Sequence, residues 1–586
     1  MPVKTNLLVN CDDALLFWSV EAPIPNCLGF AIDRERQLAN GHVKADVLDN
    51  RMGFRADKPK SGDHRPSTQW PFQRLWWTDH DVNLGDTVRY RVYPMVREGA
   101  KLKAVDAERS TWTAWQTLSA GKRDGYAAFF NRGLVISQFM ARYLERLRAA
   151  KGLATRKEAL KAFKDSLGEH ELPIRKFLSG ALRTGMLALL QDAKDNGKQV
   201  YGALYELADD ELVDGLCALG ASAHVVLANG SITKKKTETT AEARQRDENA
   251  VARKALNAAG VEVHDRFVSP GALGHNKFLV VRNQAGKPEA AWTGSTNWTS
   301  TGLCTQTNNG LLVTHRGFAQ TYLDQWDRLR DAGSVFPKDL VDSNSTAKPV
   351  KTNKSSAAIW FSRTKGKVDL QALDDEINAA QDGVLFLMFQ PGGSGALKTI
   401  RDLAKAKPAL YVRGVVSTLP SDAADDESEV KVDLHADATK KKPMTLDVVQ
   451  PRGIHPFASW AATVARNEFL TLQGGVIGFA IVHSKVIVID PFTKPVVITG
   501  SHNFSGNAST ANDENFAIVR GNKELAASYA AHLMGVYDHY RWMSLVGQRQ
   551  DQEKGAKQLS GYLAETDVWL GRKLKSAARE MKFWMR

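Results

Sequence analysis

The sequence predicts an α/β protein of two duplicated α/β/α halves with mixed sheets, preceded by an all-β sandwich domain. Three observations lead to this fold class. Aromatic and β-branched runs fill residues 1–115, helical periodicity begins near residue 125, and the later order of helices and strands is repeated on both sides of a polar segment. Helices alternating with apolar strands are typical of α/β folds, and a long internal repeat indicates duplication.

The first 115 residues contain short runs such as ALLFWSV and TVRYRVYPMV, separated by turns. Runs of this composition favour strands, so residues 1–115 are predicted to form the sandwich. Tyr90 lies six residues after Leu84 in LGDTVRYRV. This spacing resembles the tyrosine-corner strand of a fibronectin type III or immunoglobulin-like module, although any half-buried strand would also explain the tyrosine.

Residues 116–341 and 357–586 are the predicted halves, and the second half ends in helices. Each half has helix, strand, helix and strand, then a polar insertion, a helix such as ENAVARKALNAAG or ASWAATVARNEFL, and a closing pair of strands. Between them, residues 342–356 read DSNSTAKPVKTNKSS, with only two apolar residues. Such a segment cannot anchor a core and is predicted to be a linker.

The two polar insertions carry opposite charge. SITKKKTETTAEARQR in the first half is basic, whereas SDAADDESEV in the second half is acidic. They are either solvated loops or segments that flank the mouth of a cleft and sort substrates.

The composition narrows the class of partner. The chain of 586 residues has 78 Lys and Arg against 65 Asp and Glu, and this net charge of +13 favours an anionic substrate or a polyanionic partner. Its apolar runs are shorter than the roughly 18 to 20 residues of a membrane-spanning helix, and we find no secretion signal. Four dispersed cysteines without a CxxC pair argue against a disulfide framework and a zinc site. We therefore expect a soluble, cytoplasmic protein.

Two HxK triplets, at residues 275–277 and 483–485, stand in the same context. Each is followed by an apolar strand, a turn and a GSxN tetrapeptide, and each GSxN by an asparagine twelve residues after its own. A third triplet, at residues 42–44, lacks this context. Because about two His-x-(Lys/Arg) triplets are expected by chance, we interpret the third one as a surface or loop pair.

The paired motifs predict a phosphate site. In an HxK motif on a strand the histidine and lysine point to the same face, so two facing motifs bring two imidazoles and two ammonium groups together. Lys277 and Lys485 would neutralise nonbridging oxygens, while one of the two histidines, His275 and His483, attacks phosphorus and the other protonates the leaving oxygen. Further hydrogen bonds to the phosphate are expected from the GSxN side chains Ser295, Asn297, Ser501 and Asn503.

With these motifs the sequence resembles the phospholipase D superfamily, whose signature is HxK(x)4D followed by GSxN, twice per chain. The resemblance covers roughly residues 125–545, and the segments FFNRG, IWFSR and GSHNFSGNA with NDEN resemble bacterial members. It implies a site at the junction of the halves, a covalent phosphohistidine intermediate, and neither metal nor cofactor. The substrates it implies are phospholipids, DNA, RNA and pyrophosphate-like head groups.

The chain departs from this signature in two places. The signature aspartate is present as Asp490, where we expect a structural role, but Arg282 stands at its place in the first half. The acid that the family has near GSxN is Glu514 in the second half and Asn308 in the first.

In the family this acid reaches across the pseudo-twofold to the opposite histidine. The resemblance therefore pairs Glu514 with His275 and Asn308 with His483. It implies a catalytic role for Glu514, with His275 as the nucleophile and His483 as the general acid, and it places Asn308 among the residues at the substrate.

The predicted function is metal-independent hydrolysis of phosphodiester bonds, with DNA or RNA favoured as substrate because a line of phosphates suits a basic protein. We find no interfacial amphipathic helix or exposed aromatic loop that a lipid enzyme would use. Two alternatives stay open: a phospholipase D acting on phospholipid head groups, and a catalytically weak phosphate-binding or nucleic-acid-binding protein, which Arg282 and Asn308 would suit. The N-terminal sandwich is a candidate docking module for a protein or for the substrate.

Overall fold

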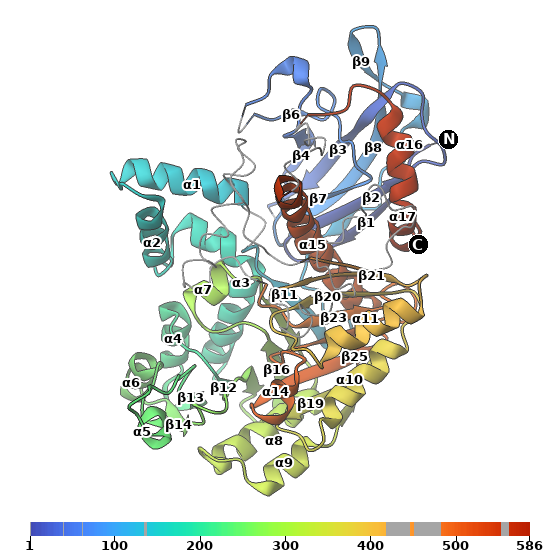
Figure 1. The fold of residues 1–586 in the computed structure, drawn as a ribbon. Helices are drawn as coiled ribbons and strands as arrows, with labels where there is room; N and C mark the ends of the chain where they lie inside the picture. Colours follow the sequence, from blue (N-terminus) through green and yellow to red (C-terminus); the bar gives the residue numbers. More distant parts are fainter. Residues whose placement is uncertain are drawn as a thin grey trace.

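The computed structural model of the chain describes residues 2–38, 40–60, 63–133, 137–417, 446–449, 482–551 and 562–586. Figure 1 shows the N-terminal strands in blue at one end of the molecule and the two repeated halves beside each other at the other end, the first in cyan to green and the second in yellow to orange. The expected insertion SDAADDESEV and the expected helix ASWAATVARNEFL lie outside the described residues.

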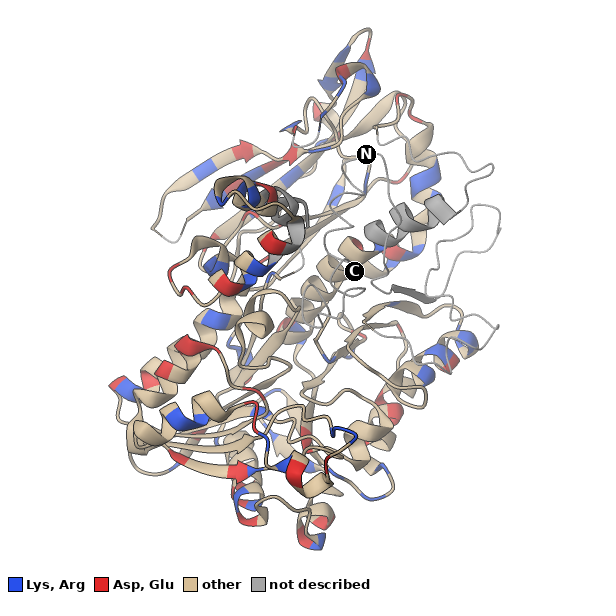
Figure 2. Ribbon diagram, turned by 60° about the vertical axis from the view of Figure 1, so that its left-hand side comes forward, with Lys and Arg blue, Asp and Glu red and all other residues tan. Residues whose placement is uncertain are grey.

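The N-terminal region consists of antiparallel ladders within the described ranges, as predicted. One sheet has the order β1-β2-β7 and a second the order β10-β8-β3-β4, with β9 paired to β8 and a short β5-β6 ladder beside them. Figure 2 shows basic and acidic residues interspersed along these strands. The strands are β1 (Lys4–Val9), β2 (Ala14–Ser19), β3 (Cys27–Gln37), β4 (Val43–Val47), β5 (Asp49–Asn50), β6 (Arg65–Pro66), β7 (Trp76–Asp79), β8 (Thr87–Glu98), β9 (Lys101–Ala104) and β10 (Gln116–Thr117).

The first half contains a mixed sheet in the order β11-β17-β16-β15-β12-β13-β14, in which β12, β13 and β14 run parallel and the other pairs antiparallel. Its strands are β11 (Tyr126–Phe130), β12 (Gln199–Leu204), β13 (Ala223–Ala228), β14 (Glu262–Arg266), β15 (Lys277–Arg282), β16 (Pro288–Gly294) and β17 (Asn309–Val313). Its helices are α1 (Ser137–Ala150), α2 (Arg156–Ser166), α3 (Pro173–Asp195), α4 (Asp210–Cys217), α5 (Thr240–Arg244), α6 (Ala250–Ala258), α7 (Ser300–Cys304), α8 (Arg316–Ala332) and α9 (Lys338–Asn344).

The second half repeats this topology. Its sheet has the order β18-β19-β25-β24-β23-β20-β21-β22, and from β19 onward each strand matches one strand of the first sheet, including the parallel run at the end. The duplication and the mixed sheets are therefore confirmed. The strands are β18 (Lys348–Lys351), β19 (Ser356–Ser362), β20 (Gly383–Met388), β21 (Tyr411–Val416), β22 (Leu446–Val449), β23 (Val486–Ile489), β24 (Val496–Gly500) and β25 (Glu514–Arg520). The helices are α10 (Val368–Asn378), α11 (Ala396–Ala406), α14 (Gly506–Thr510), α15 (Lys523–Asp551), α16 (Val568–Ser576) and α17 (Ala578–Trp584).

Helices cover both faces of the second sheet. Along β20, Val384 and Phe386 belong to the core that α10 and α11 complete. The alternate residues Leu385 and Leu387 belong to the core that α15 shares with the N-terminal sheet. This alternation is what a strand buried on both faces requires, and it explains the unbroken apolar run of β20.

The predicted linker contributes regular structure, which its polar composition did not indicate. The strand β18 lies within residues 342–356 and pairs with β19 at the edge of the second sheet. Val350 is buried, whereas the flanking residues of β18 are Lys348, Pro349 and Lys351. Lysine and proline are common on edge strands, where they discourage pairing with a further strand. A polar segment therefore joins the halves as an ordered edge strand.

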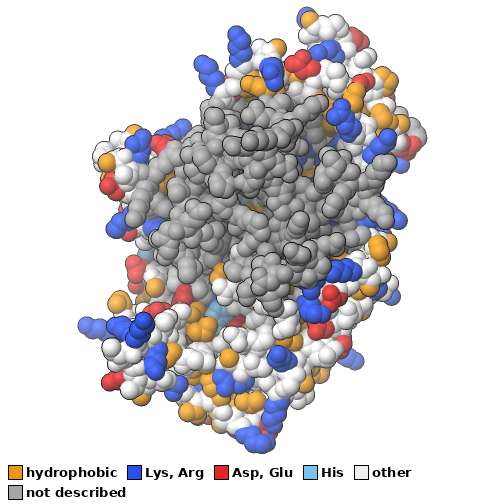
Figure 3. Space-filling model, viewed as in Figure 1, with side chains coloured by type: hydrophobic (Ala, Val, Ile, Leu, Met, Phe, Trp, Pro, Cys, Tyr) orange, Lys and Arg blue, Asp and Glu red, His pale blue; other side chains and the backbone are white. Residues whose placement is uncertain are grey.

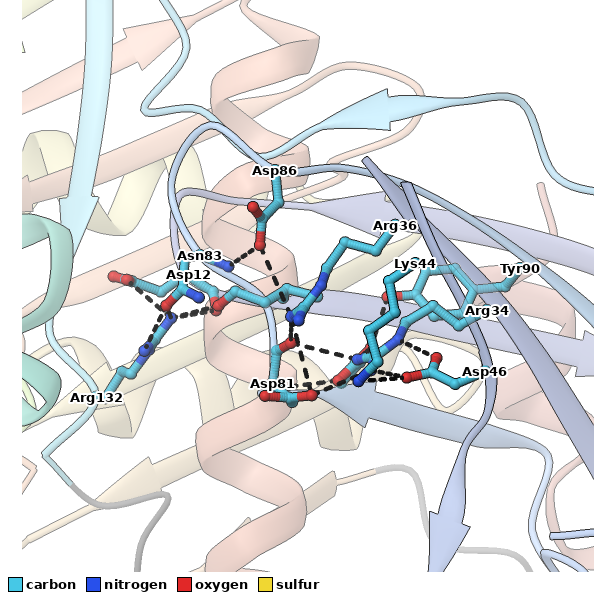
Figure 4. Close-up of polar contacts among 12 residues, drawn as sticks. Asp12, Arg34, Arg36, Lys44, Asp46, Asp81, Asn83, Asp86, Tyr90 and Arg132 are labelled. Carbon is cyan, nitrogen blue, oxygen red and sulfur yellow. Dashed lines mark hydrogen bonds and ion pairs between the residues drawn. The ribbon is translucent and has the colours of Figure 1, made fainter. Parts of the chain in front are cut away.

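Tyr90 on β8 has different surroundings from a tyrosine in a corner. Its hydroxyl donates to Asp79 Oδ2 at 2.8 Å, whereas a corner tyrosine bonds to the backbone. Asp79 also accepts from Arg34 at 2.8 Å, and Arg34 in turn binds Asp46, as Figure 4 shows. The residue therefore belongs to a buried ion network, and the expected corner is absent at this position.

Arg132, which follows β11, fastens the N-terminal sheets to the first half. Its guanidinium donates to the carbonyl oxygens of Val82 at 2.5 Å and Asp12 at 3.2 Å, and to the side chain of Asn83 (Figure 4). The Asp12 carboxylate accepts the backbone N–H of Ala181 in α3 at 3.2 Å. Burial raises the pKa of Asp12 to about 6, although the Arg132 charge opposes this.

The C-terminal helices return to the N-terminal sheet, which the sequence did not indicate. Phe17 of β2 stacks on Trp584, with ring centroids 4.7 Å apart. Trp569 Nε1 donates to the carbonyl oxygen of Cys27 at 2.9 Å, and Asn6 Nδ2 donates to that of Trp584 at 2.6 Å. The helices α16 and α17 thus pack on the sandwich, although they follow the second half in the chain. In the ranges that the structure covers, every helix is too short or too polar to cross a lipid bilayer.

Candidate active site

The first HxK motif lies where the chain leads into β15. Lys277 is the first residue of β15 and His275 precedes it, so the motif stands at the start of a strand rather than within it. The Tyr205 ring centroid is 4.7 Å from the His275 ring and 4.8 Å from Lys277 Nζ. Lys277 also donates to the carbonyl oxygen of His275 at 2.9 Å. Both side chains therefore lie on one side of the chain, as expected for alternate residues of an extended segment.

The second motif repeats this arrangement. His483 and Lys485 precede β23, and Phe389 takes the place of Tyr205, 4.7 Å from the His483 ring and 4.9 Å from Lys485 Nζ. Lys485 donates to the carbonyl oxygen of His483 at 2.6 Å. All four motif residues are buried, with exposed fractions of at most 4%. The structure thus holds two imidazoles and two amines away from bulk water.

Each imidazole is held through Nδ1 by the opposite half. Glu514 Oε2 lies 2.9 Å from His275 Nδ1. Asn308 Oδ1 lies 3.0 Å from His483 Nδ1, and the carbonyl oxygen of Ser295 lies 3.1 Å from the same atom. A hydrogen bond at Nδ1 orients the ring and sets its tautomer. Asn308 therefore orients His483, and its contact with the substrate stays a prediction.

The glycines of the two GSxN segments allow a close approach between strands. A β-carbon on Gly294 would lie 2.3 Å from the carbonyl oxygen of Asn309, and one on Gly500 would lie 2.2 Å from that of Asn515. Any larger residue would separate β16 from β17, or β24 from β25, and displace the partners of the histidines.

Ser295 and Ser501 bond to the neighbouring strand, and the expectation that they also bind the phosphate stays a prediction. The Ser295 hydroxyl donates to Asn308 Oδ1 at 2.7 Å and accepts the backbone N–H of Asn309 at 3.0 Å. The Ser501 hydroxyl accepts the backbone N–H of Asn515 at 3.0 Å. Both serines are fully buried. The two hydroxyls therefore position residues of the site.

The asparagines that follow each GSxN at a constant spacing cross between the halves. Asn309 Nδ2 donates to Thr499 Oγ1 at 2.8 Å, and Thr293 Oγ1 donates to Asn515 Oδ1 at 2.6 Å. The two bonds are reciprocal, since one joins β17 to β24 and the other joins β16 to β25, the counterparts of these strands in exchanged order. They hold the motifs of the two halves in one site.

Asn297 is bound by an acidic residue, Glu206, that the sequence motifs did not identify as part of the site. Asn297 Nδ2 donates to Glu206 Oε2 at 2.7 Å. Glu206 follows Tyr205 just after β12, and Phe389 and Gln390 occupy the matching places after β20. The repeated aromatic-polar pair at the ends of equivalent strands was a signal in the sequence that could have identified both positions.

The sequence was compared with models of known protein families and with curated proteins. A family model described as "Cardiolipin synthase, PLD-like domain" matches residues 186–330 and 373–536, more than half of the chain. The chain belongs to the phospholipase D superfamily. No curated protein matches its sequence.

Several solved structures are similar to this member of the phospholipase D superfamily. Phosphatidylserine synthase from Haemophilus influenzae is 12% identical with a TM-score of 0.38, over 70% of this chain and 94% of that chain. Nuc, a phospholipase D family member from Salmonella typhimurium, is 15% identical with a TM-score of 0.21, over 27% of this chain and 93% of that chain. Polyphosphate kinase from Porphyromonas gingivalis is 10% identical with a TM-score of 0.38, over 91% of this chain and 74% of that chain.

The aspartate of the superfamily signature is structural here. The Asp490 carboxylate accepts the backbone N–H groups of residues 381–383 at 2.7 to 2.9 Å and so holds the start of β20 beside the end of β23. Its counterpart Arg282 donates to the Tyr201 hydroxyl at 2.7 Å and to the carbonyl oxygen of Gly286 at 2.8 Å. Both residues stabilise strand ends, so replacing the aspartate with Arg282 leaves the motif in place.

Burial governs the protonation of the cationic groups. It lowers the pKa of His275 to about 4, against the opposing charge of Glu514. Burial, together with the charges of Lys485 and Lys277, lowers the pKa of His483 well below its ordinary value. Burial also lowers the pKa of Lys277 to about 7, and burial with the Lys277 charge lowers that of Lys485. Without a bound anion, burial therefore favours the neutral form of both imidazoles. A phosphate bound between the lysines would favour the protonated form of His483, which the role of general acid requires.

The two carboxylates of the site respond in opposite directions. Burial by itself would raise the pKa of Glu514, but the neighbouring His275 lowers it overall. Burial raises the pKa of Glu206, although the charge of Lys277 opposes the change. A phosphate anion between the two lysines would supply the countercharge that buried ammonium groups need.

Proposed function

We propose that this chain is a metal-independent phosphodiesterase that cleaves nucleic acid strands through a covalent phosphohistidine. One observation carries the proposal. Two HxK motifs meet in a single buried site, and each histidine is held at Nδ1 by a residue of the opposite half. This arrangement leaves the two Nε2 atoms for chemistry on a phosphate bound by the lysines.

In the proposed first step His275 Nε2 attacks phosphorus as the P–O bond to the leaving group breaks. His483 gives its proton to that oxygen. In the second step the same imidazole accepts a proton from water, the water oxygen attacks phosphorus, and the P–N bond breaks. The product leaves with a new P–O bond, and both histidines return to their starting states.

Glu514 supports the assignment of His275 as nucleophile. Attack through Nε2 places positive charge on the imidazole, and a carboxylate 2.9 Å from Nδ1 stabilises that charge. Asn308 is neutral and gives His483 no comparable stabilisation. A less stabilised imidazolium releases its proton more readily, which suits a general acid.

The substrate class rests on charge. The net charge of +13 favours a ligand with many phosphates, because each phosphate that binds a lysine or arginine releases counterions. Among the described side chains in Figure 3, the basic ones are scattered over the face and interspersed with acidic ones. Phospholipid head groups are the second candidate, favoured by the description of the matched family model.

The test is a substrate panel with the purified protein: plasmid, single-stranded DNA, RNA and phosphatidylcholine vesicles, each with and without EDTA. We expect cleavage of nucleic acid that persists in excess chelator, because Lys277 and Lys485 supply the charge that metal ions supply in two-metal nucleases. His483→Ala is the matched control for contaminating nuclease.

Three results of this panel would contradict the proposal. Activity that EDTA abolishes and Mg2+ restores would reject the metal-independent mechanism. Release of choline from vesicles without cleavage of nucleic acid would select the lipid substrate. Nucleic-acid binding without turnover of any substrate would select the binding protein.

A further inference from the structure

A pocket of about 770 Å3 opens between the two halves beside the motif residues. Gln390 and Asn503 line it, and these are the second-half counterparts of Glu206 and Asn297. The first half contributes residues 271–273, which lead directly into His275. Among the predicted site residues it is Asn503 that lines the pocket, so the pocket adjoins the predicted phosphate site through this residue.

The walls of this pocket suit an anion. Among the described residues that line it are serine, threonine, asparagine and glutamine side chains and one cation, Lys367, but no aspartate or glutamate. Hydroxyl and amide groups together with an ammonium provide several donors for the oxygens of a phosphate.

The equivalent position in the first half has the opposite character. Asn297 is bound by the Glu206 carboxylate, whereas Asn503 lies in the pocket beside the neutral Gln390. The amide oxygens of Asn297 and Asn503 both lack a hydrogen-bond partner among the described residues, so the two positions differ in the charge of Glu206 against the neutral Gln390. A second phosphate would be repelled by the Glu206 carboxylate and accepted beside the neutral Gln390. A bound strand would therefore extend from the site on the side of Gln390.

Two donors of the pocket converge above Gly506. The point that a β-carbon on Gly506 would occupy lies 3.4 Å from Lys367 Nζ and 3.8 Å from Ser394 Oγ. The loop that carries Ser394 is held close, because a β-carbon on Gly395 would lie 2.0 Å from the carbonyl oxygen of Phe504. The glycines thus leave a space between an ammonium and a hydroxyl that is open to the pocket.

The basic insertion continues the pocket outward. Ile232 lines the pocket, and its backbone N–H donates to Ser269 Oγ at 3.0 Å, which anchors the start of the insertion. The exposed residues 234–236 are all lysines and follow within four residues of Ile232. At about 3.5 Å per residue they lie at most about 14 Å along the chain from the pocket wall. Glu238 of the same insertion is paired with Arg246.

We propose that this pocket and the adjoining basic insertion bind the phosphates that flank the scissile one in a single nucleic acid strand. Lys367, above Gly506, would bind the nearest flanking phosphate, and residues 234–236 would bind phosphates farther along. The inference rests on the proposed nuclease function. It adds the path of the bound strand, which would leave the site on the side of Gln390 and not on the side of Glu206.

The test compares a long and a short ligand in the His483→Ala background. Fluorescence anisotropy measures binding of a thymidylate decamer and of the dinucleotide TpT, which has only the central phosphate, at several salt concentrations. Alanine at Lys367 and at residues 234–236 should weaken decamer binding at least tenfold more than TpT binding. The slope of log K against log salt should become shallower by about 2 to 3, at roughly 0.7 for each neutralised phosphate of a single strand.

Two further variants separate a specific site from a general loss of charge. Gly506→Ala retains every charge but places a methyl group between Lys367 and Ser394, and it should weaken the decamer more than TpT. The matched control replaces four exposed lysines of the N-terminal region, Lys58, Lys60, Lys101 and Lys103, and should alter binding of neither ligand. The last two belong to β9, which lies at the far end of the molecule from α14 (Figure 1).

The outcomes distinguish this inference from the proposed function. If the His483→Ala protein binds neither oligonucleotide, the proposed nuclease function is wrong and the inference with it. If it binds the decamer and the pocket variants bind equally well, or the distant control weakens binding as much, the inference is wrong and the nuclease function stands. Pocket variants that lose binding to phosphatidylglycerol vesicles but not to the decamer would also overturn the inference.

Discussion

His275 and His483 occupy matching places but have different partners. A carboxylate holds the first imidazole and an amide the second, each at about 3 Å from Nδ1. The same asymmetry recurs beside the lysines, where Glu206 binds Asn297 and its counterpart Gln390 faces the pocket. At the scale of single residues, therefore, the duplicated site combines two chemically different halves.

The protonation of Lys277 is expected to limit activity in alkaline solution. Burial lowers the pKa of Lys277 to about 7, and the charges of Glu514 and Glu206 partly oppose this lowering. Removing one carboxylate makes the ammonium less stable, so Glu206→Gln should lower this pKa further. The alkaline decline of kcat/KM on a small phosphodiester should move to lower pH, and activity near pH 8 should fall about three- to tenfold.

Glu169→Gln is the control for this experiment, because Glu169 is exposed and acts on the pKa of neither Lys277 nor Glu206. It should leave the alkaline decline at the pH of the unmodified protein. A decline that stays in place in Glu206→Gln, or moves to higher pH, would show that Lys277 does not control it.

The sequence identified much of the site because its motifs are duplicated. Both histidines, both lysines and the pair Glu514 and Asn308 meet in one place in the structure. The bonds from the GSxN serines to a neighbouring strand were not predicted, since residue type does not reveal them, and the binding of these serines to substrate stays a prediction. Glu206 was missed because it reaches Asn297 from a strand end that no motif marks.

At the scale of elements, the local pattern of apolar residues predicted the strands. It failed for elements whose structure or packing depends on tertiary contacts. The apolar runs of β2 and β20 indicated buried strands, and the order of elements indicated the repeat. The edge strand β18 was not predicted, because its residues are polar and show no strand pattern. Its hydrogen-bonded pairing with β19 makes this segment a strand. The packing of α16 and α17 on the sandwich joins residues more than 500 positions apart, such as Asn6 and Trp584, and periodicity contains no such information.

Trp584 should be a main support of the contact between the sandwich and the second half. It is fully buried, stacks on Phe17, and donates from Nε1 to the Tyr411 hydroxyl at 3.0 Å. Trp584→Ala removes a large buried side chain and leaves a cavity, so the free energy of unfolding should fall by about 3 to 5 kcal/mol. Urea denaturation followed by circular dichroism measures the loss.

Trp115 provides the comparison, because 41% of its surface is exposed. Trp115→Ala should cost about 1 kcal/mol or less, as expected for a substitution at the surface. Equal losses in the two variants would mean that the C-terminal helices do not stabilise the fold through Trp584.

At the scale of the whole molecule, the two sheets are joined by reciprocal hydrogen bonds, and each half completes the site of the other. Asn309 and Asn515 reach across the junction, and Glu514 and Asn308 do the same for the histidines. Neither half contains the complete set of groups that we propose to be catalytic. This dependence explains why duplicated motifs at distant positions in the sequence form one site.

The central claim is that His275 is the nucleophile and His483 the general acid and base. The direct measurement uses thymidine 5′-(p-nitrophenyl phosphate), whose leaving group departs without a proton, and maps the adduct by mass spectrometry. In His483→Ala the first step proceeds but the water of the second step lacks its base, so an acid-labile nucleotidyl group should accumulate on His275, and His275→Ala should form none. An adduct on His483 in the His275→Ala protein would contradict the assignment.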